Sequence, residues 1–358
     1  MGLDYQKIIT HFDLEGEIGK VEAFGNGLIH QTFRLHNQDA SAPDYLLQRI
    51  NDHVFHDITG MTANLEYVTS HLSKKYENAN KAFLDPIKTG SGELIHRTSD
   101  NQYWRVFVFL KGYQSFDTSP GISYVYEGAK AFGNFIKDMS DFPVEKLKAV
   151  IPDFHHLGSR FEQLGFAKKN GDRERLNQSA ELIKIAELQY KRLEEMVTAI
   201  EENLFPLRVT HNDTKFNNVL FQSNGEARCV IDLDTTMPGV VHYDLGDGLR
   251  TGAVDCDEDE KDLEKVAVND EKLTTYCRGF IEPLKNTLAP IEIRYLPLAA
   301  SYMALIMGVR FLSDFINNDS YYHIEYPDQN FRRARCQIRL GELFYEKRQL
   351  VEQSFNDL

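Results

Sequence analysis

The segment from 209 to 222, VTHNDTKFNNVLFQ, places side chains that can bind metals, carry charge and transfer protons beside an apolar strand. Asp213 and Asn218 precede the apolar residues, and Asp232 follows the next apolar run, in VIDLD. Asn-Gly lies between the two runs and is a strong hairpin signal. Because a hairpin brings its two ends together, we expect the three oxygen-bearing side chains to converge. Such a set suits Mg²⁺ that is held jointly with the phosphates of a nucleotide.

Lys215 lies two residues after Asp213 and supplies the positive charge that a moving phosphoryl group needs. The spacing Asp-x-Lys-x-x-Asn, followed by an Asp on the next strand, is the arrangement that kinases use for base, cation and metal ligands. Asp213 would then orient and deprotonate the acceptor hydroxyl, while Asn218 and Asp232 hold magnesium. A loop of Asx residues that only caps a hairpin explains each residue singly but not the set.

The elements that must position these residues fall into a β-rich first part and a mainly helical second part. Strands are predicted at 18–24, 28–35, 45–50 and 101–110, with a helix at 61–76. Later helices are predicted at 122–140, along an amphipathic run at 172–204 and through most of 244–355, interrupted by the hairpin after 207. The apolar stretch 296–309 is too short to span a bilayer and is predicted as a buried helix.

The length of 358 residues favours two lobes. We predict an α+β, protein-kinase-like bilobal fold with an antiparallel β-rich N-lobe and a mainly helical C-lobe. The N-lobe covers the nucleotide and spans 1–108, the hinge spans 109–118, and residues 119–358 form the C-lobe, which carries the catalytic loop and the acceptor site. Four residues are predicted to contact the nucleotide, two in the glycine turn and two at the hinge: Gly25, Gly27, Phe109 and Leu110.

Composition excludes several classes of protein. The formal charge is -14, from 40 basic and 54 acidic residues, so the field of the whole protein repels a polyanion such as a nucleic acid. The four cysteines form no CxxC pair, which favours reduced thiols over a disulfide framework or a zinc site. With no signal peptide in the first residues and no membrane span, a cytoplasmic location is expected. Composition leaves the oligomeric state open.

The segments HNDTKFNN at 211 and IDLDTTMPG at 231 resemble the catalytic and metal-binding loops of the aminoglycoside phosphotransferase and choline kinase superfamily. The nearest likeness is to the bacterial N-acetylhexosamine 1-kinases, and it extends through GNG at 25, FGNF at 132, RFEQL at 160 and GVRFLSDF at 308. The resemblance implies ATP and Mg²⁺ as cofactors, Asp213 as the base, and Asn218 and Asp232 as metal ligands.

The same resemblance implies a small sugar as the acceptor, phosphorylated on the anomeric hydroxyl of N-acetylglucosamine or N-acetylgalactosamine. Another sugar, an aminoglycoside, choline or homoserine are the alternatives within the superfamily, and a binding module without turnover is a further one. Arg310 and Tyr321 are the implied sugar contacts. An ion pair with Asp314 is the alternative for Arg310, and core packing is the alternative for Tyr321.

Two departures from the family pattern bear on the site. The sugar kinases carry a histidine directly after the glycine turn, where this chain has Leu28, and His30 is the candidate substrate contact two residues later. The third strand, YLLQRIN, lacks the lysine of protein kinases, and Arg49 is the candidate cation in its place. Glu66 is the helix carboxylate that such a cation would pair with.

Overall fold

The computed structural model describes residues 5–25, 29–76 and 83–356, and the chain divides into two compact units. The first unit contains residues 1–115, 141–151 and 219–238, and the second contains residues 116–140, 152–218 and 239–358. The first unit thus takes in the hairpin region after 218, which the sequence analysis assigned to the helical lobe. The boundaries of the lobes stay a prediction.

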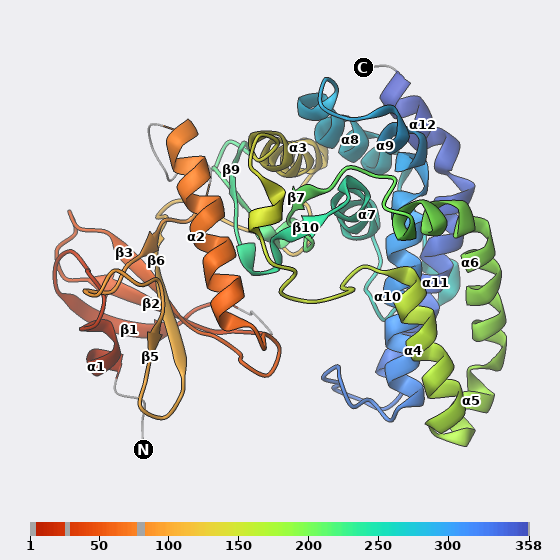
Figure 1. The fold of residues 1–358 in the computed structure, drawn as a ribbon, viewed down its shortest axis with the longest axis horizontal. Coiled ribbons are helices and arrows are strands. Elements are labelled where there is room, and N and C mark those ends of the chain that lie inside the picture. Colours follow the sequence, from red (N-terminus) through yellow and green to blue (C-terminus); the bar gives the residue numbers. More distant parts are fainter. Residues whose placement is uncertain (1–4, 26–28, 77–82, 357–358) are drawn as a thin grey trace. The chain divides into compact units, whose positions relative to one another are not determined.

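An antiparallel sheet forms the centre of the first unit (Figure 1). Its strand order is β1-β2-β3-β6-β4, and β5 pairs with β6. The strands span Ile18–Ala23 (β1), Gln31–Asn37 (β2), Asp44–Arg49 (β3), Pro86–Ile87 (β4), His96–Arg97 (β5) and Tyr103–Phe109 (β6). Side chains of β2, β3 and β6 that point to the same face form a buried core, including Leu35, Leu47, Trp104 and Val106. The predicted strands of this part are confirmed.

Helix α2, Ile58–Lys75, begins after Asp57, whose carboxylate accepts a hydrogen bond from a backbone N–H of the first turn at 2.8 Å. On its buried side, the Nδ2 atom of Asn64 donates to the carbonyl oxygens of Lys148 (2.8 Å) and Thr236 (3.0 Å). One amide therefore joins three stretches of the first unit that lie far apart in sequence. The predicted helix at 61–76 is confirmed.

The predicted hairpin is also present in the first unit. Strands β8 (Val219–Phe221) and β9 (Ala227–Val230) pair antiparallel, with Val219 opposite Val230. The turn contains Gly225 at φ 89°, a left-handed conformation that glycine adopts without strain. The remaining short elements of this unit are α1 (Tyr5–Ile9) and the 3-10 turns η2 (Val144–Lys146) and η4 (Leu233–Thr235). Strand β10, Met237–Gly239, lies at the sequence boundary with the second unit.

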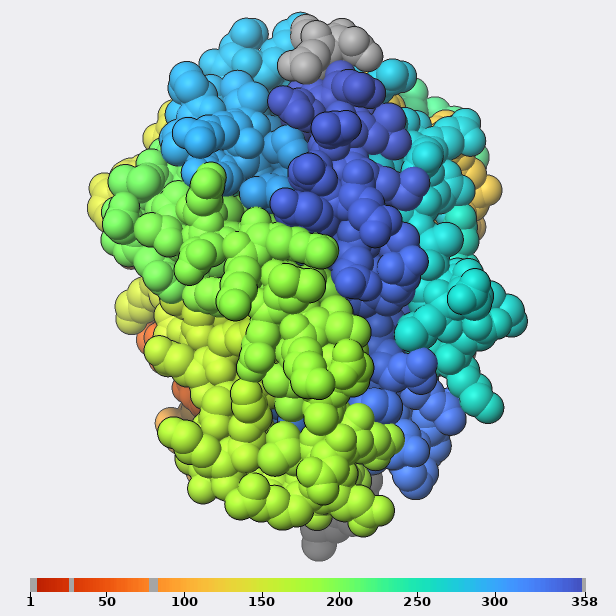
Figure 2. All heavy atoms as spheres, turned by 90° about the vertical axis from the view of Figure 1, so that its right-hand side faces the viewer, coloured from red at the N-terminus to blue at the C-terminus, as the bar shows by residue number. Residues whose placement is uncertain are grey.

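The second unit is mainly helical. Its helices are α3 (Ile122–Asp138), α4 (Leu157–Asn170), α5 (Arg173–Gln178), α6 (Ala180–Glu201), α7 (Val241–Gly252), α8 (Asp270–Ile281), α9 (Pro290–Tyr295), α10 (Ala299–Ile316), α11 (Gln329–Glu346) and α12 (Arg348–Asn356). Strand β7 (Arg208–Thr210) and the 3-10 turns η3 (Phe216–Asn218), η5 (Leu263–Lys265), η6 (Glu282–Leu284) and η7 (Leu296–Leu298) complete it. Figure 2 shows the face on which α4, α5 and α6 lie beside α11 and α12.

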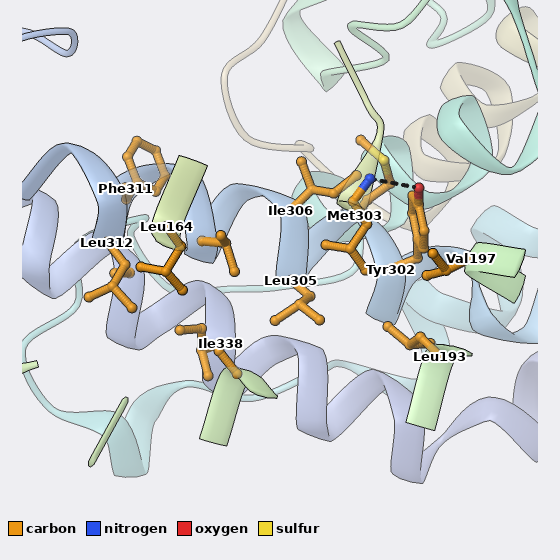
Figure 3. Close-up of a cluster of buried hydrophobic side chains, with 14 of the residues drawn as sticks. Leu164, Leu193, Val197, Tyr302, Met303, Leu305, Ile306, Phe311, Leu312 and Ile338 are labelled. Atoms are coloured by element: carbon orange, nitrogen blue, oxygen red, sulfur yellow. Dashed lines mark hydrogen bonds between the residues drawn. The ribbon is translucent and has the colours of Figure 1, made fainter. Parts of the chain in front are cut away.

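Helix α10 is the centre of the second unit and packs against α4, α7 and α11. Its side chains enter a cluster with residues of those helices and of α6, including Leu164, Leu193, Leu305, Leu312 and Ile338 (Figure 3). The stretch Pro290–Ile316 is long and apolar enough to cross a membrane, but 78% of its most apolar window is buried inside the protein. The expectation of a buried helix at 296–309 is thus confirmed, whereas the expectation of a stretch too short to span a bilayer is wrong, because the helical stretch extends from 290 to 316.

Candidate active site

The loop between β7 and η3 in the second unit carries the candidate base. The Nζ atom of Lys215 lies 2.9 Å from Oδ1 of Asp213. On the other side, Nδ2 of Asn218 donates to Oδ2 of Asp213 at 3.0 Å and to its carbonyl oxygen at 2.8 Å. The loop therefore closes on itself around one carboxylate, and three of the predicted site residues lie together.

Electrostatics keep this carboxylate ionised. Burial alone would raise the pKa of Asp213, but the Lys215 ammonium and the Asn218 amide outweigh it, so the pKa lies below its usual value. The same ion pair, acting against burial, raises the pKa of Lys215. At neutral pH the loop thus presents a carboxylate that can accept a hydroxyl proton, next to an ammonium that can bind a phosphoryl oxygen.

Two buried aspartates of α7, neither of them among the predicted site residues, hold the loop in place. Asp244 accepts hydrogen bonds from the backbone N–H groups of His211 and Asn212, each at 2.8 Å. Asp247 accepts one from the N–H of Thr214 at 2.9 Å. Acids three residues apart in HYDLGD share one helix face, which was the available signal. Burial raises the pKa of Asp244 to about 6.

The candidate metal ligand Asp232 lies in the first unit. It is exposed and takes a left-handed backbone conformation (φ 62°, ψ 63°). Two residues later, Asp234 is buried and bonded to the guanidinium of Arg105 and to Nε2 of His30, the latter at 2.6 Å. Nδ1 of His30 accepts a hydrogen bond from the N–H of Asn51 at 3.1 Å. Both ring nitrogens of His30 are therefore engaged inside the first unit.

The oxygen donors fit a hard divalent cation. Because Nδ2 of Asn218 bonds to Asp213, the carbonyl oxygen of the amide is its remaining acceptor, and Asp232 offers an exposed carboxylate. Within the described residues, His, Cys, Asp and Glu side chains form no group of three that could hold a metal by themselves. This set suits a metal that is also bound by phosphates. Asn218 and Asp232 belong to different units, so their convergence stays a prediction.

On the predicted nucleotide side, Gly25 has φ 75° and follows the exposed Phe24. Gly27 and Leu28 lie outside the described residues. Phe109, the last residue of β6, packs edge-on against Phe24, with ring centroids 5.4 Å apart. Phe24, which leads into the glycine turn, and the end of β6 are thus neighbours in the first unit.

The other candidates near the nucleotide are a half-buried apolar residue and two charged residues that have partners on the protein. Leu110 follows β6 and is half-buried. Arg49 lies 3.3 Å from the side-chain oxygen of Gln31, on the neighbouring strand. The carboxylate of Glu66 pairs with the ammonium of Lys88 at 3.1 Å, and about half of each side chain is exposed. Arg49 and Glu66 are therefore bonded to residues other than each other.

On the predicted acceptor side, Arg310 lies on α10 with its guanidinium carbon 5.3 Å from the ring centre of Phe154 and 5.5 Å from that of Tyr322. Asp314, its alternative partner, accepts hydrogen bonds from the backbone N–H groups of Tyr321 (2.8 Å) and Tyr322 (2.9 Å). Tyr321 itself is 69% exposed, so it is no core residue. Among the described residues, Arg310 thus contacts two aromatic faces and the sulfur of Met307, and no carboxylate forms an ion pair with it.

Two polar side chains whose charges interact with that of Arg310 are not among the predicted site residues. The pKa of Arg160 is lowered by burial and by the charge of Arg310. His155 bonds through Nε2 to the carbonyl oxygen of Asn212 at 3.0 Å, and burial lowers its pKa to about 4. No partner for its Nδ1 atom is found among the described residues. Because Asn212 immediately precedes Asp213, this cluster borders the candidate base.

The sequence profile of the family described as Phosphotransferase enzyme family (APH) matches residues 20–268. An aminoglycoside phosphotransferase from Alicyclobacillus acidocaldarius shares the fold, with a TM-score of 0.66 and 16% identity over 99% of this chain and 98% of that chain. A microcompartment-associated aminopropanol kinase gives 0.65 and 14%, over 97% and 98%. A choline kinase from Streptococcus pneumoniae gives 0.55 and 10%, over 91% and 94%. These matches confirm the kinase-like fold and the resemblance to the superfamily.

Proposed function

Because the chain belongs to the phosphotransferase enzyme family, we propose that it transfers the γ-phosphate of ATP to the anomeric hydroxyl of an N-acetylhexosamine. N-acetylglucosamine and N-acetylgalactosamine are the expected acceptors, and the sugar 1-phosphate and ADP are the products. The observation that carries the chemistry is the ionised Asp213, held between the Lys215 ammonium and the Asn218 amide.

Residues of the chain itself account for most of the catalytic roles. Asp213 orients the acceptor hydroxyl and takes its proton as the new O–P bond forms and the bond between the γ-phosphorus and the β,γ-bridging oxygen breaks. Lys215 neutralises charge on the transferred group. Asn218 and Asp232 would hold Mg²⁺, which supplies further neutralisation when it is bound with the nucleotide. Asp244 and Asp247 keep the loop in the conformation that aims the base.

The surroundings of Arg310 support a sugar over a cationic acceptor. A guanidinium donates several hydrogen bonds in one plane, which suits sugar hydroxyl and acyl oxygens. The charges of Arg310 and Arg160 act on each other, so this region repels a quaternary ammonium or an amine. Choline, aminopropanol and aminoglycosides carry positive charge, which two neighbouring guanidinium groups disfavour.

The acceptor is tested by product identification. The protein is incubated with MgATP and, separately, with N-acetylglucosamine, N-acetylgalactosamine, other sugars, an aminoglycoside, choline, aminopropanol and homoserine, and products are identified by phosphorus NMR. We expect a sugar 1-phosphate only with the N-acetylhexosamines. Preferential phosphorylation of a cationic acceptor would overturn the proposed specificity, and no turnover with any acceptor would support a binding module.

The role of Asp213 is tested by Asp213→Asn, which keeps the shape of the side chain but removes the base. We expect kcat to fall by about 10²–10⁴-fold with little change in ATP affinity. The control is Asp117→Asn, an exposed aspartate that accepts a hydrogen bond from the side chain of Asn217 at 3.0 Å. Equal loss in both variants would mean that the acid at 213 has no special role in the chemistry.

A further inference from the structure

The third strand of the first unit has no lysine, yet a positive charge lies directly beside it. Gln48 on β3 pairs across the sheet with Arg105 on β6. The Nε atom of Arg105 donates to the side-chain oxygen of Gln48 at 3.0 Å. Residues opposite each other on adjacent strands project to the same face, so the guanidinium lies over the face to which the Gln48 side chain points.

Among the described residues, the guanidinium bonds to one carboxylate, and it does so with a defined geometry. Both terminal nitrogens of Arg105 bond to Asp234, the Nη2 atom at 2.7 Å from Oδ2. The two residues are 3% and 2% exposed. A planar two-bond pair of this kind fixes orientation as well as distance. The pair therefore ties β6 rigidly to the η4 turn.

His30 closes the network from the other side. Its Nε2 atom lies 2.6 Å from Oδ2 of Asp234, while Nδ1 accepts from the N–H of Asn51, which places the ring proton on Nε2. Its ring also stacks on Phe55, with centroids 5.5 Å apart. His30 immediately precedes β2, so the network links the strand that follows the glycine turn to Asp234.

Asp234 is only two residues after the candidate metal ligand. Asp232 has a left-handed backbone, a conformation that aspartate adopts more readily than most other residues. Asp234 is held by Arg105 and His30, and the carbonyl oxygen of Thr236 is held by Asn64 of α2. The segment that follows Asp232 is thus anchored at Asp234 and again at Thr236.

We propose that the Arg105–Asp234 pair, closed by His30, is the positioning device that aims Asp232 at the metal and sets the metal-dependent part of nucleotide affinity. Its role differs from that of a strand-lysine and helix-glutamate pair, since the buried Arg105 guanidinium is bonded to Gln48 and Asp234. The inference rests on the proposed function, because it needs a bound metal nucleotide. It adds three positioning residues to the reaction and makes His30 one of them.

The test compares Arg105→Gln, Asp234→Asn and His30→Gln with a matched control. Arg97→Gln removes another arginine of the same sheet, whose Nη2 atom donates to the side-chain oxygen of Asn101 at 2.9 Å. The readouts are ATP affinity by calorimetry with and without Mg²⁺, and Mn²⁺ binding to the protein–ATP complex by electron paramagnetic resonance. The Michaelis constants for ATP and for the acceptor are measured in parallel.

We expect metal affinity in the ATP complex to weaken by about 10–100-fold in the network variants, as for residues that orient metal ligands. ATP affinity without metal, the KM for the acceptor and all constants of Arg97→Gln should stay close to those of the unchanged protein. His30→Gln keeps the Arg105–Asp234 pair, so it decides the question if the other two variants fail to fold.

Two results would overturn the inference: unchanged metal affinity in folded His30→Gln, or equal weakening of ATP binding with and without metal. The second result would mark the network as a support of the fold only. Failure of the proposed function is distinguishable, since the unchanged protein would then bind no MgATP or would phosphorylate no N-acetylhexosamine.

Discussion

The four cysteine side chains differ in exposure and in thiol pKa, so they should differ in their reactivity towards a thiol reagent. Cys229, Cys277 and Cys336 are buried, whereas Cys256 is partly exposed. A hydrogen bond from the Cys336 thiol lowers the pKa of Cys256, while burial raises the pKa of Cys277 to a value at which it stays a thiol. The thiolate is the reactive form, so one position should dominate.

We therefore predict that iodoacetamide labels Cys256 first in the native protein. Peptide mass spectrometry after short exposure measures the order of labelling, and Cys256→Ser is the control, which should abolish the fast phase. Labelling of Cys277 at the same rate in folded protein would contradict the prediction. In urea, all four thiols should react at similar rates because their environments no longer differ.

At the level of residues, the catalytic loop was predictable and its supports were not. Asp213, Lys215 and Asn218 lie within six positions, so their types and spacing are visible in the sequence. Asp244 and Asp247 bond to backbone groups of the loop about thirty positions earlier, and an acid on an amphipathic helix usually faces solvent. The two acids on one face of the helix were visible in the sequence, but that pattern does not show which backbone groups they bind.

Among the helices, α7 and α10 approach each other closely at one glycine. A Cβ atom added at Gly246 would lie 2.3 Å from the carbonyl oxygen of Ala299, which is backbone and cannot rotate away. We predict that Gly246→Ala lowers the free energy of unfolding by about 1–3 kcal/mol through overpacking. Urea denaturation followed by circular dichroism measures it.

The matched control is Gly165→Ala on α4, where an added Cβ meets nothing within 4 Å. This substitution should raise the free energy of unfolding by about 0.5–1 kcal/mol, because alanine loses less conformational freedom in a helix. Equal effects of the two substitutions would show that the approach of α7 to α10 is not tight. Since α7 carries Asp244 and Asp247, kcat should fall only in Gly246→Ala.

The ranges of helices and strands were predictable where the hydrophobic periodicity of a short segment determines them. The strands and the α2 helix fall within a few residues of their predicted ranges. The amphipathic run at 172–204, however, is divided into α5 and α6 at Ser179. The hydroxyl of Ser179 bonds to the carbonyl oxygen of Arg175 at 2.7 Å, and this local bond ends one helix without disturbing the apolar pattern.

For the protein as a whole, the free energy of unfolding depends on pH, because buried groups with shifted pKa values change it in opposite directions. Burial raises the pKa of Asp244 from 3.8 to about 6, so its favourable contribution is complete below pH 3.8 and is lost as the pH rises through 6. Burial lowers the pKa of His155 and His242 to about 4, so their contribution grows as the pH rises from 4 towards 6.5.

We predict the Asp244 contribution from the difference between the unchanged protein and Asp244→Asn, in which the histidine effects cancel. The free energy of unfolding of the variant, relative to the unchanged protein, should rise by roughly 3 kcal/mol between pH 4 and pH 7. Urea titrations at intervals of half a pH unit measure the two curves. Parallel curves would mean that Asp244 is ionised at pH 4 in the folded protein.

The Arg105–Asp234 pair also sets an order of events during translation, because its members are 129 positions apart. A ribosome that adds about 5–20 residues per second leaves the guanidinium without its carboxylate for roughly 6–26 s. Through that interval the nascent sheet carries an arginine that cannot yet be enclosed, so its final burial must wait for the hairpin region to emerge. The first unit can therefore complete its buried network only after residue 234 has left the exit tunnel.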